Sequence, residues 1–230
     1  AKLFNIKTIV MITGLGTAFI ADNWITRLVK LLYRFALSSV ATVFFQNNDD
    51  KGLFLKNNLI KPNVCELTPG SGIDTCQFTY SPLPQNSEIT FILIARMLWD
   101  KGIDEYVQAA RIIKLKYPNT KFQLLGALGV ENRTAISDER MAAWVTEGSV
   151  EYLGETTDVK PYIEKSCCVV LPSYREGTSR VLLEAASMGR PIIASDVPGC
   201  REVVENGITG LLCRSKDSYD LSKKMETMIN

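Results

Sequence analysis

The chain contains no histidine. This excludes Ser–His and Cys–His nucleophile pairs, HExxH zinc sites and Cys/His zinc fingers. The six cysteines form no CxxC pair, and Cys167 and Cys168 are adjacent in an apolar run. Such cysteines are typical of small buried side chains in a reducing compartment, which predicts a cytoplasmic protein.

A charge bias and a long apolar run are also missing. Lys and Arg number 26 and Asp and Glu 25, so a net charge of +1 gives no general attraction to nucleic acid. No eighteen apolar residues follow one another, so we expect no transmembrane helix. The start, AKLFNIKTIVMITGLG, lacks the charged region and cleavage site of a signal peptide.

What the chain does contain is a patterned segment, residues 167–212. A short apolar run is followed by a polar turn, and Thr178 or Ser179 then supplies the N-cap of a helix. Gly189 ends that helix, and a second apolar run predicts the next strand. The turn therefore lies at the carboxyl edge of a parallel sheet, where such folds bind ligands.

The turn has the parts of an anion site with acids beside it. Gly177 allows the backbone to approach a ligand closely, and the amides of Thr178 and Ser179 open a helix whose dipole favours negative charge. Glu184 lies in the second turn of an otherwise apolar helix, where a carboxylate can accept two hydrogen bonds from a ribose. Glu176 lies in the turn itself. The alternative is that both carboxylates are merely solvated.

Strands alternate with helices from residue 89 onward, which predicts an α/β fold with a doubly wound, Rossmann-like parallel sheet. Arg96 ends the first of these strands, and Lys101 precedes a helix expected over 103–116. Two cations on that edge would bracket a diphosphate and neutralise a departing nucleoside diphosphate. Either cation alone is more simply explained as a solvated surface charge.

The first seventy residues carry a second, shorter set of signals. A strand at 6–12 leads into the glycine loop of Thr13, Gly14 and Gly16, which suggests a turn near a substrate cleft. A dinucleotide fingerprint needs a third glycine where Phe19 stands, so an NAD-dependent oxidoreductase fits poorly.

Residues 22–37 predict an amphipathic helix with basic residues along its apolar stripe. It is suited either to a membrane interface or to packing on its own sheet with its cations in water.

The segment REGTSRVLLEAASMGRPIIASDVPGCREVV, with Glu176 and Glu184 seven residues apart, resembles the paired-glutamate motif of the retaining glycosyltransferases of family 4. The resemblance covers some forty residues. It implies that Glu184 holds the nucleotide ribose and that Glu176 lies beside the donor sugar. ARMLWDKG resembles the Arg/Lys pair that binds the donor diphosphate in that family, which assigns this role to Arg96 and Lys101. Thr13 stands where many members carry histidine, so a histidine-dependent acceptor contact is in doubt.

The resemblance implies a GT-B fold and transfer of a sugar from a nucleotide-diphosphate sugar, here a UDP-sugar, without a metal or a cofactor. The acceptor would be a glycan or polyprenyl-linked lipid of bacterial surface-polysaccharide synthesis at the inner face of the membrane. Residues 1–70 would form an incomplete acceptor-side domain, 71–88 a linker and 89–230 the donor domain, since the chain looks truncated at both ends. A donor-binding fragment without activity and a sugar-nucleotide epimerase of the same fold remain alternatives.

Overall fold

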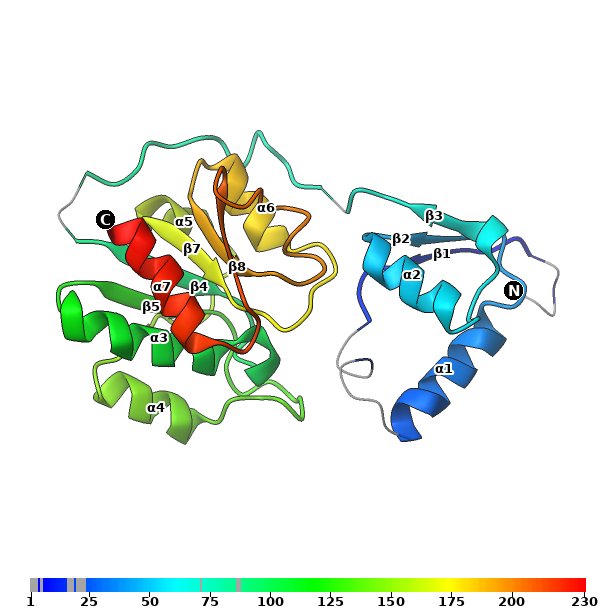
Figure 1. The fold of residues 1–230 in the computed structure, drawn as a ribbon, viewed down its shortest axis with the longest axis horizontal. Coiled ribbons are helices and arrows are strands. Elements are labelled where there is room, and N and C mark those ends of the chain that lie inside the picture. Colours follow the sequence, from blue (N-terminus) through cyan, green and yellow to red (C-terminus); the bar gives the residue numbers. More distant parts are fainter. Residues whose placement is uncertain (1–3, 5, 16–18, 20–23, 71, 86–87) are drawn as a thin grey trace. The chain divides into compact units, whose positions relative to one another are not determined.

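The computed structural model describes residues 4, 6–15, 19, 24–70, 72–85 and 88–230 (Figure 1). The chain forms two compact units. The first comprises residues 1–72 together with 176–178, and the second comprises residues 73–175 together with 179–230. Among the described residues, no helix combines the length and the apolar character that crossing a membrane requires.

The first unit contains a parallel sheet in the strand order β1-β2-β3. Its elements are β1 (Ile9–Ile12), α1 (Trp24–Ala36), β2 (Thr42–Phe45), α2 (Asn48–Lys56), a 3-10 turn η3 (Pro62–Val64) and β3 (Cys65–Leu67). Phe54 of α2 packs edge-on against Phe45 of β2, with ring centroids 5.1 Å apart, and both side chains are fully buried. Parallel strands cannot be joined by tight turns, so each crossover carries a helix or helical turn.

Helix α1 presents its apolar stripe to solvent. The exposed large side chains are Trp24, Leu28, Leu31, Leu32 and Phe35, and Trp24 and Phe35 are 72% and 73% exposed. Thr26 is the side chain that α1 buries. The helix nevertheless packs on its own unit through Tyr33, whose ring centroid lies 5.0 Å from that of Phe54, while the apolar stripe stays exposed.

The second unit is built on a six-stranded parallel sheet in the order β6-β5-β4-β7-β8-β9. The strands are β4 (Thr90–Ile94), β5 (Lys121–Leu125), β6 (Glu151–Tyr152), β7 (Cys168–Leu171), β8 (Ile192–Ser195) and β9 (Gly210–Cys213). The predicted doubly wound parallel sheet is confirmed. Strand β9 was not predicted, because Gly210 suggests a turn and the apolar run that follows it, residues 211–213, is too short to indicate a strand.

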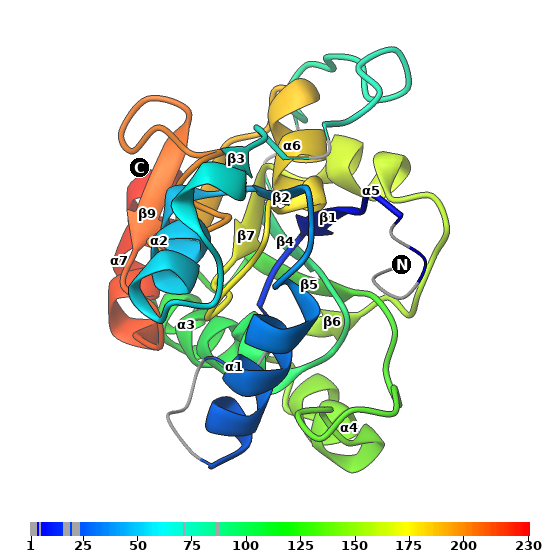
Figure 2. The same cartoon turned by 90° about the vertical axis from the view of Figure 1, so that its right-hand side faces the viewer.

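Helices cover both faces of this sheet (Figures 1 and 2). One face carries α3 (Ile103–Lys116), α4 (Asp138–Thr146) and α7 (Ser218–Ile229), and the other carries α5 (Lys160–Lys165) and α6 (Arg180–Ser187). Each face has its own apolar core. Tyr106, Trp144 and Leu221 represent the first core, and Ile163 and Leu182 the second.

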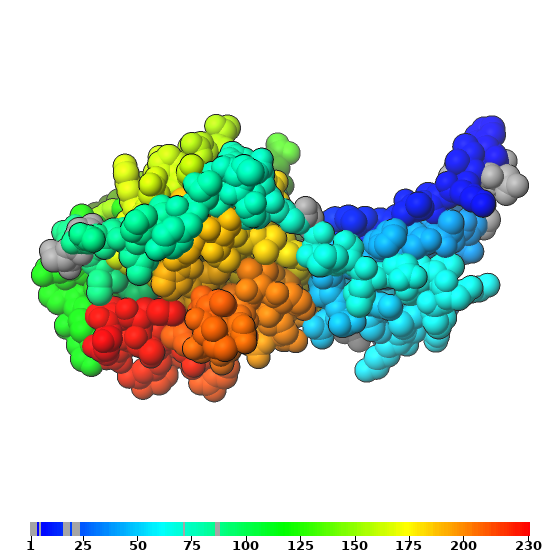
Figure 3. Space-filling view, turned by 90° about the horizontal axis from the view of Figure 1, so that it is seen from above, coloured from blue at the N-terminus to red at the C-terminus, as the bar shows by residue number. Residues whose placement is uncertain are grey.

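The segment rich in Pro, Gly and Ser lies against the second unit, where residues 73–85 form a teal band along its surface (Figure 3). Ser187 Oγ donates to the Phe78 carbonyl at 2.5 Å, and Ser81 N donates to the Met188 carbonyl at 3.3 Å. Gly189, with a φ of 72°, allows this close approach, since a Cβ there would lie 2.6 Å from the Tyr80 ring.

Arg190 holds this segment from inside the unit. Its side chain is 2% exposed. The guanidinium donates to carbonyls of Ser81 and Pro82 at 2.8 and 2.9 Å, and to carbonyls of Ile163 and Glu164 at 3.0 Å each. A planar cation with five fixed donors therefore joins an extended segment to the end of α5.

Replacing Arg190 with Met should destabilise the second unit by roughly 2–4 kcal/mol, because the buried carbonyls lose their donors and keep their desolvation cost. Urea unfolding followed by tryptophan fluorescence measures this. Arg111→Met is the matched control: Arg111 makes a solvent-accessible ion pair with Glu147 at 2.5 Å, and such pairs contribute little to stability because water and salt screen them. Equal losses in the two variants would contradict a structural role for Arg190.

Candidate active site

The strand order of the second unit reverses direction between β4 and β7. These neighbours pair through Phe91 with Cys168 and Ile92 with Val169, so their carboxyl ends, Ile94 and Leu171, share one edge. In doubly wound sheets the crevice outside the strand ends at such a reversal is where ligands bind. The loop at 95–102 follows β4 and the loop at 172–179 follows β7, so the two loops leave the sheet on either side of this reversal.

The first of these loops carries the two predicted cations. Arg96 follows β4 and is exposed, and its carbonyl accepts a hydrogen bond from Leu98 N at 2.8 Å. Lys101 is the last residue of the 3-10 turn η4 (Trp99–Lys101) and is half-buried. The structure thus brings both cations onto one short loop at the sheet reversal. Their contact with a diphosphate stays a prediction.

The two loops are packed against each other at Gly102. This glycine has a φ of 73°, and a Cβ there would lie 2.1 Å from the Pro172 carbonyl oxygen, so no other residue fits without displacing the backbone. The Asp100 carbonyl beside it accepts hydrogen bonds from Tyr174 N at 2.9 Å and Ser173 Oγ at 3.1 Å. The loop with the cations and the loop that leads to Glu176 are therefore one connected structure.

The beginning of α6 differs in part from the sequence prediction. Ser179 occupies the N-cap position and is buried, but its side chain makes no capping hydrogen bond. Its amide donates to the Gly199 carbonyl at 3.1 Å, so this N–H is not open to a phosphate in the structure. The predicted amide cradle therefore loses two members. Thr178 N donates to Gln46 Oε1 at 3.0 Å, and the loop after β8 reaches the helix end at Ser179. The sequence gives no signal of that approach.

Glu184 is a buried carboxylate on α6. It is 7% exposed, and Oε1 lies 3.6 Å from the exposed guanidinium of Arg180 one turn earlier. Burial raises the pKa of the Glu184 carboxyl, and Arg180 opposes the rise. A carboxylate that is costly to bury in an apolar helix points to a ligand that hydrogen-bonds it.

The remaining predicted residues are placed as follows. Glu176, Gly177 and Thr178 form the loop between β7 and α6 and are half-buried. Thr13 and Gly14 follow β1, and Gly16 lies outside the described residues. The acceptor-side role of the three loop residues stays a prediction.

Sequence reasoning missed Asp100, Ser173 and Tyr174, the residues that join the two loops. Tyr174 directly precedes Arg175-Glu176, but its partners are about seventy residues away in sequence. Only the pairing of β4 with β7 brings them together. Within the described part of the chain, no group of three or more His, Cys, Asp or Glu side chains is arranged to hold a metal ion.

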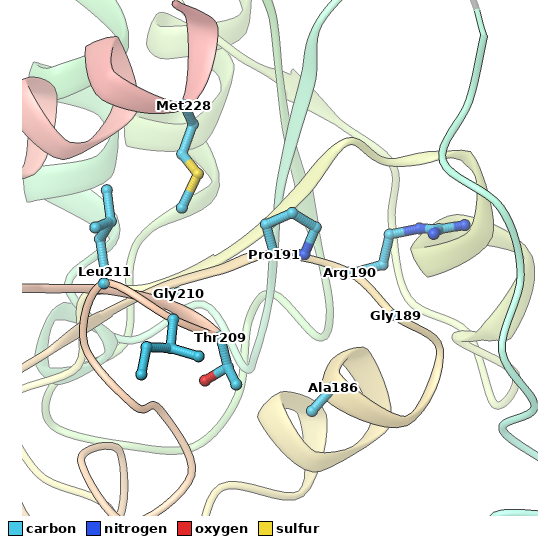
Figure 4. A pocket seen from close by; sticks show the side chains of 10 residues that line it. Ala186, Gly189, Arg190, Pro191, Thr209, Gly210, Leu211 and Met228 are labelled. Atoms are coloured by element: carbon cyan, nitrogen blue, oxygen red, sulfur yellow. The ribbon is translucent and has the colours of Figure 1, made fainter.

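A separate pocket of about 400 Å³ lies at the opposite edge of the sheet (Figure 4). Pro191 before β8, Gly210 at the start of β9 and Met228 near the end of α7 line it. The Arg190 guanidinium, which could have supplied charge, points away from it toward its own hydrogen-bond partners. This pocket has no part in the site at the sheet reversal.

The chain is similar to proteins of a known family. Residues 88–230 match the family model described as "Glycosyl transferases group 1". A Campylobacter jejuni enzyme named N,N'-diacetylbacillosaminyl-diphospho-undecaprenol alpha-1,3-N-acetylgalactosaminyltransferase is 29% identical over 95% of this chain. The capsular polysaccharide biosynthesis glycosyltransferase CapM of Staphylococcus aureus is 26% identical over 87% of it. The chain spans 60% and 55% of the lengths of these two relatives.

Solved structures share the fold. HepE from Anabaena, solved in complex with UDP, has a TM-score of 0.79 and 20% identity, and the match covers 97% of this chain and 62% of HepE. Sucrose-phosphate synthase from Thermosynechococcus elongatus has a TM-score of 0.82 and 22% identity, covering 99% of this chain and 60% of the synthase. The predicted GT-B type of fold is confirmed.

Glu184→Gln should make the protein more stable at neutral pH, because the variant has no carboxylate to desolvate. In the wild type the raised folded pKa means that stability is lost as the pH rises from 4.5 through that pKa. The difference in melting temperature between variant and wild type should therefore grow across that window and then level off. Melting curves from pH 4 to 8 measure it.

Glu147→Gln is the control of opposite sign. The Arg111 guanidinium lowers the pKa of Glu147 to about 2. The stability that the ionised Glu147 contributes is therefore fully present above pH 4.5 and is lost as the pH falls from 4.5 toward about 2. Glu147→Gln should destabilise at neutral pH. A destabilised Glu184→Gln at neutral pH would contradict the burial argument.

Proposed function

Because the chain belongs to the glycosyl transferases group 1 family, we propose that it is a retaining, family 4 glycosyltransferase that uses a UDP-sugar and binds this donor with residues 89–230. The observation that carries this proposal is the junction at the sheet reversal. There the loop with Arg96 and Lys101 is hydrogen-bonded to the loop that leads to Glu176 and the helix of Glu184.

Each residue has a role that its chemistry supports. Arg96 and Lys101 bind the diphosphate and stabilise the negative charge that develops as it departs. Glu184 accepts hydrogen bonds from the ribose hydroxyls, which would offset the cost of burying its carboxylate. Glu176 orients the hydroxyls of the sugar or counters positive charge on its ring, and Gly177 and Thr178 complete the turn beside the phosphates.

The reaction breaks the bond between the anomeric carbon and the diphosphate oxygen, and forms a bond from that carbon to an acceptor oxygen on the same face. The acceptor proton leaves with the diphosphate or to solvent. Positive side chains on the departing group supply the main stabilisation, so the proposed site needs no metal. A covalent intermediate is not proposed, since glycosidase-type double displacement uses two carboxylates spaced across the scissile bond, and Glu184 is assigned to the ribose.

The relatives support the class of donor and acceptor. HepE is described in complexes with UDP and with UDP-glucose. The name of the Campylobacter enzyme specifies a diphospho-undecaprenol substrate, and CapM is named for capsular polysaccharide biosynthesis. We propose by analogy that this protein uses a UDP-sugar and a lipid-linked or glycan acceptor in bacterial surface-polysaccharide synthesis at the cytoplasmic side of the membrane.

Glu176→Ala and Lys101→Ala should each lower sugar transfer by at least about 100-fold, because each removes a charge from the transition state. Lys114→Ala, which removes a cation toward the far end of α3, is the control and should keep wild-type turnover. Donor consumption is measured with UDP-glucose and UDP-N-acetylgalactosamine, alongside calorimetry with UDP. Near-normal turnover in either site variant would refute the assignment.

Wild-type binding of UDP without turnover would support the alternative, a donor-binding fragment. The length of the chain, about 60% of the first relative, is the observation that favours this alternative.

We also propose that α1 contacts the membrane that would hold a lipid-linked acceptor. Its exposed stripe of Trp24, Leu28, Leu31, Leu32 and Phe35 is apolar. The basic residues Arg27 and Lys30 accompany it, and residues 24–36 contain no acidic side chain. A helix with an apolar stripe and only positive charges suits the interface of an anionic bilayer, where each cation contributes about 1 kcal/mol.

Leu31→Ser combined with Phe35→Ser should weaken binding to phosphatidylglycerol vesicles at least about tenfold, because two apolar side chains no longer enter the bilayer. Vesicle co-sedimentation at low and high salt measures this. Leu115→Ser, a change of a leucine on α3 that is 90% exposed, should leave binding unchanged. A wild type that ignores vesicles but dimerises through the stripe, shown by light scattering, would overturn the membrane proposal.

A further inference from the structure

Tyr174 links the loop after β7 to helix α3. Its hydroxyl donates to Glu105 Oε1 at 2.7 Å, and Glu105 lies in the first turn of α3. The other carboxylate oxygen of Glu105, Oε2, is buried without a hydrogen-bond partner, so Tyr174 supplies the hydrogen bond that this carboxylate does make at Oε1. The pair is not part of the donor contacts assigned above.

The same loop is held at three successive residues. Pro172 packs on Gly102, Ser173 Oγ lies 3.1 Å from the Asp100 carbonyl, and Tyr174 N donates to that carbonyl at 2.9 Å. Asp100 is fixed in turn, since Thr134 Oγ1 donates to its carboxylate at 2.7 Å. Tyr174 is the last residue of this anchored stretch, and Glu176 follows two residues later.

The charges around Tyr174 keep its hydroxyl a donor. Burial, the hydrogen bond to Glu105 and the carboxylates of Asp104 and Asp100 raise its pKa well above the ordinary value. Lys216, from the loop between β9 and α7, places Nζ 4.6 Å from the centre of the ring. The ring is therefore held between α3 and a third loop of the same sheet edge, and the hydroxyl stays protonated across the physiological pH range.

We propose that Tyr174 and Glu105 are a positioning pair, whose hydrogen bond sets the turn that carries Glu176 for the sugar half of the donor. The inference rests on the proposed function and deepens it. The diphosphate cations and Glu184 lie on other segments, namely the loop after β4 and helix α6. Loss of the pair also leaves the hydrogen bonds from Ser173 and Tyr174 N to the Asp100 carbonyl in place, so the loop with the cations keeps its anchor. It should therefore weaken recognition of the sugar and leave recognition of UDP intact.

Tyr174→Phe and Glu105→Ala remove the hydrogen bond from either side. Each should raise the Kd of a UDP-sugar about tenfold while the Kd of UDP changes less than about twofold, since one hydrogen bond to a charged group is lost near the sugar. The double variant should bind the UDP-sugar no more weakly than the single variant with the higher Kd, because both changes remove the same hydrogen bond. Glu105→Gln, whose amide oxygen still accepts from the tyrosine, should restore sugar binding.

Tyr117→Phe is the matched control. It deletes a tyrosine hydroxyl that lies 3.2 Å from Asn230 Oδ1, just beyond the far end of α3, and should leave both affinities unchanged. Calorimetry uses UDP, UDP-glucose and UDP-N-acetylgalactosamine. Hydrogen exchange of the amides of residues 175–179, without ligand, should be faster in Tyr174→Phe and Glu105→Ala and unchanged in Tyr117→Phe.

The outcomes separate the two proposals. Selective loss of sugar binding with faster exchange supports the positioning pair. Equal loss for UDP and UDP-sugar, or no loss for either, in a wild type that binds UDP overturns the pair and leaves the proposed function intact. A wild type that binds neither UDP nor the UDP-sugars refutes the proposed function, and the donor role of the pair falls with it.

Discussion

The contact between Gly102 and the Pro172 carbonyl is the constraint on which the candidate site depends. It requires a left-handed residue without a side chain where the chain enters α3, and it brings the loops after β4 and β7 within hydrogen-bonding distance. Asp100 then shares its carbonyl with Ser173 and Tyr174. A parallel sheet supplies the edge, but this close approach makes two loops act as one surface.

The proposed site includes a carboxylate whose burial lowers the stability of the fold. Glu184 is buried among the apolar side chains of α6, and burial raises its pKa. Arg190, by contrast, is a buried charge whose hydrogen bonds are supplied by the protein. Arg190 is thus satisfied by several carbonyls of the protein, whereas Glu184 has one distant ion-pair partner, Arg180, and its role toward a ligand stays a proposal.

Helix α1 shows the limit of reading amphipathicity as burial. A stripe of Trp, Leu and Phe ordinarily marks the side that faces a core, yet here Trp24, Leu31 and Phe35 are exposed and Thr26 is buried. Periodicity records only that one side is apolar. What covers that side depends on the surroundings of the helix, which for this protein leads to the proposed membrane contact.

The sequence by itself determined the fold class, the family and α3, because apolar periodicity, Gly102 and Pro118 act over a few neighbouring residues. It also singled out Arg96, Lys101, Glu176 and Glu184, through a motif whose roles stay predictions. Only the tertiary structure decided that Ser179 gives its amide to Gly199, that Arg190 holds residues 81 and 82, and that Tyr174 meets Glu105. These partners are separated by 20 to about 110 residues in sequence, and local patterns carry no information about which distant atoms strand pairing will bring into contact.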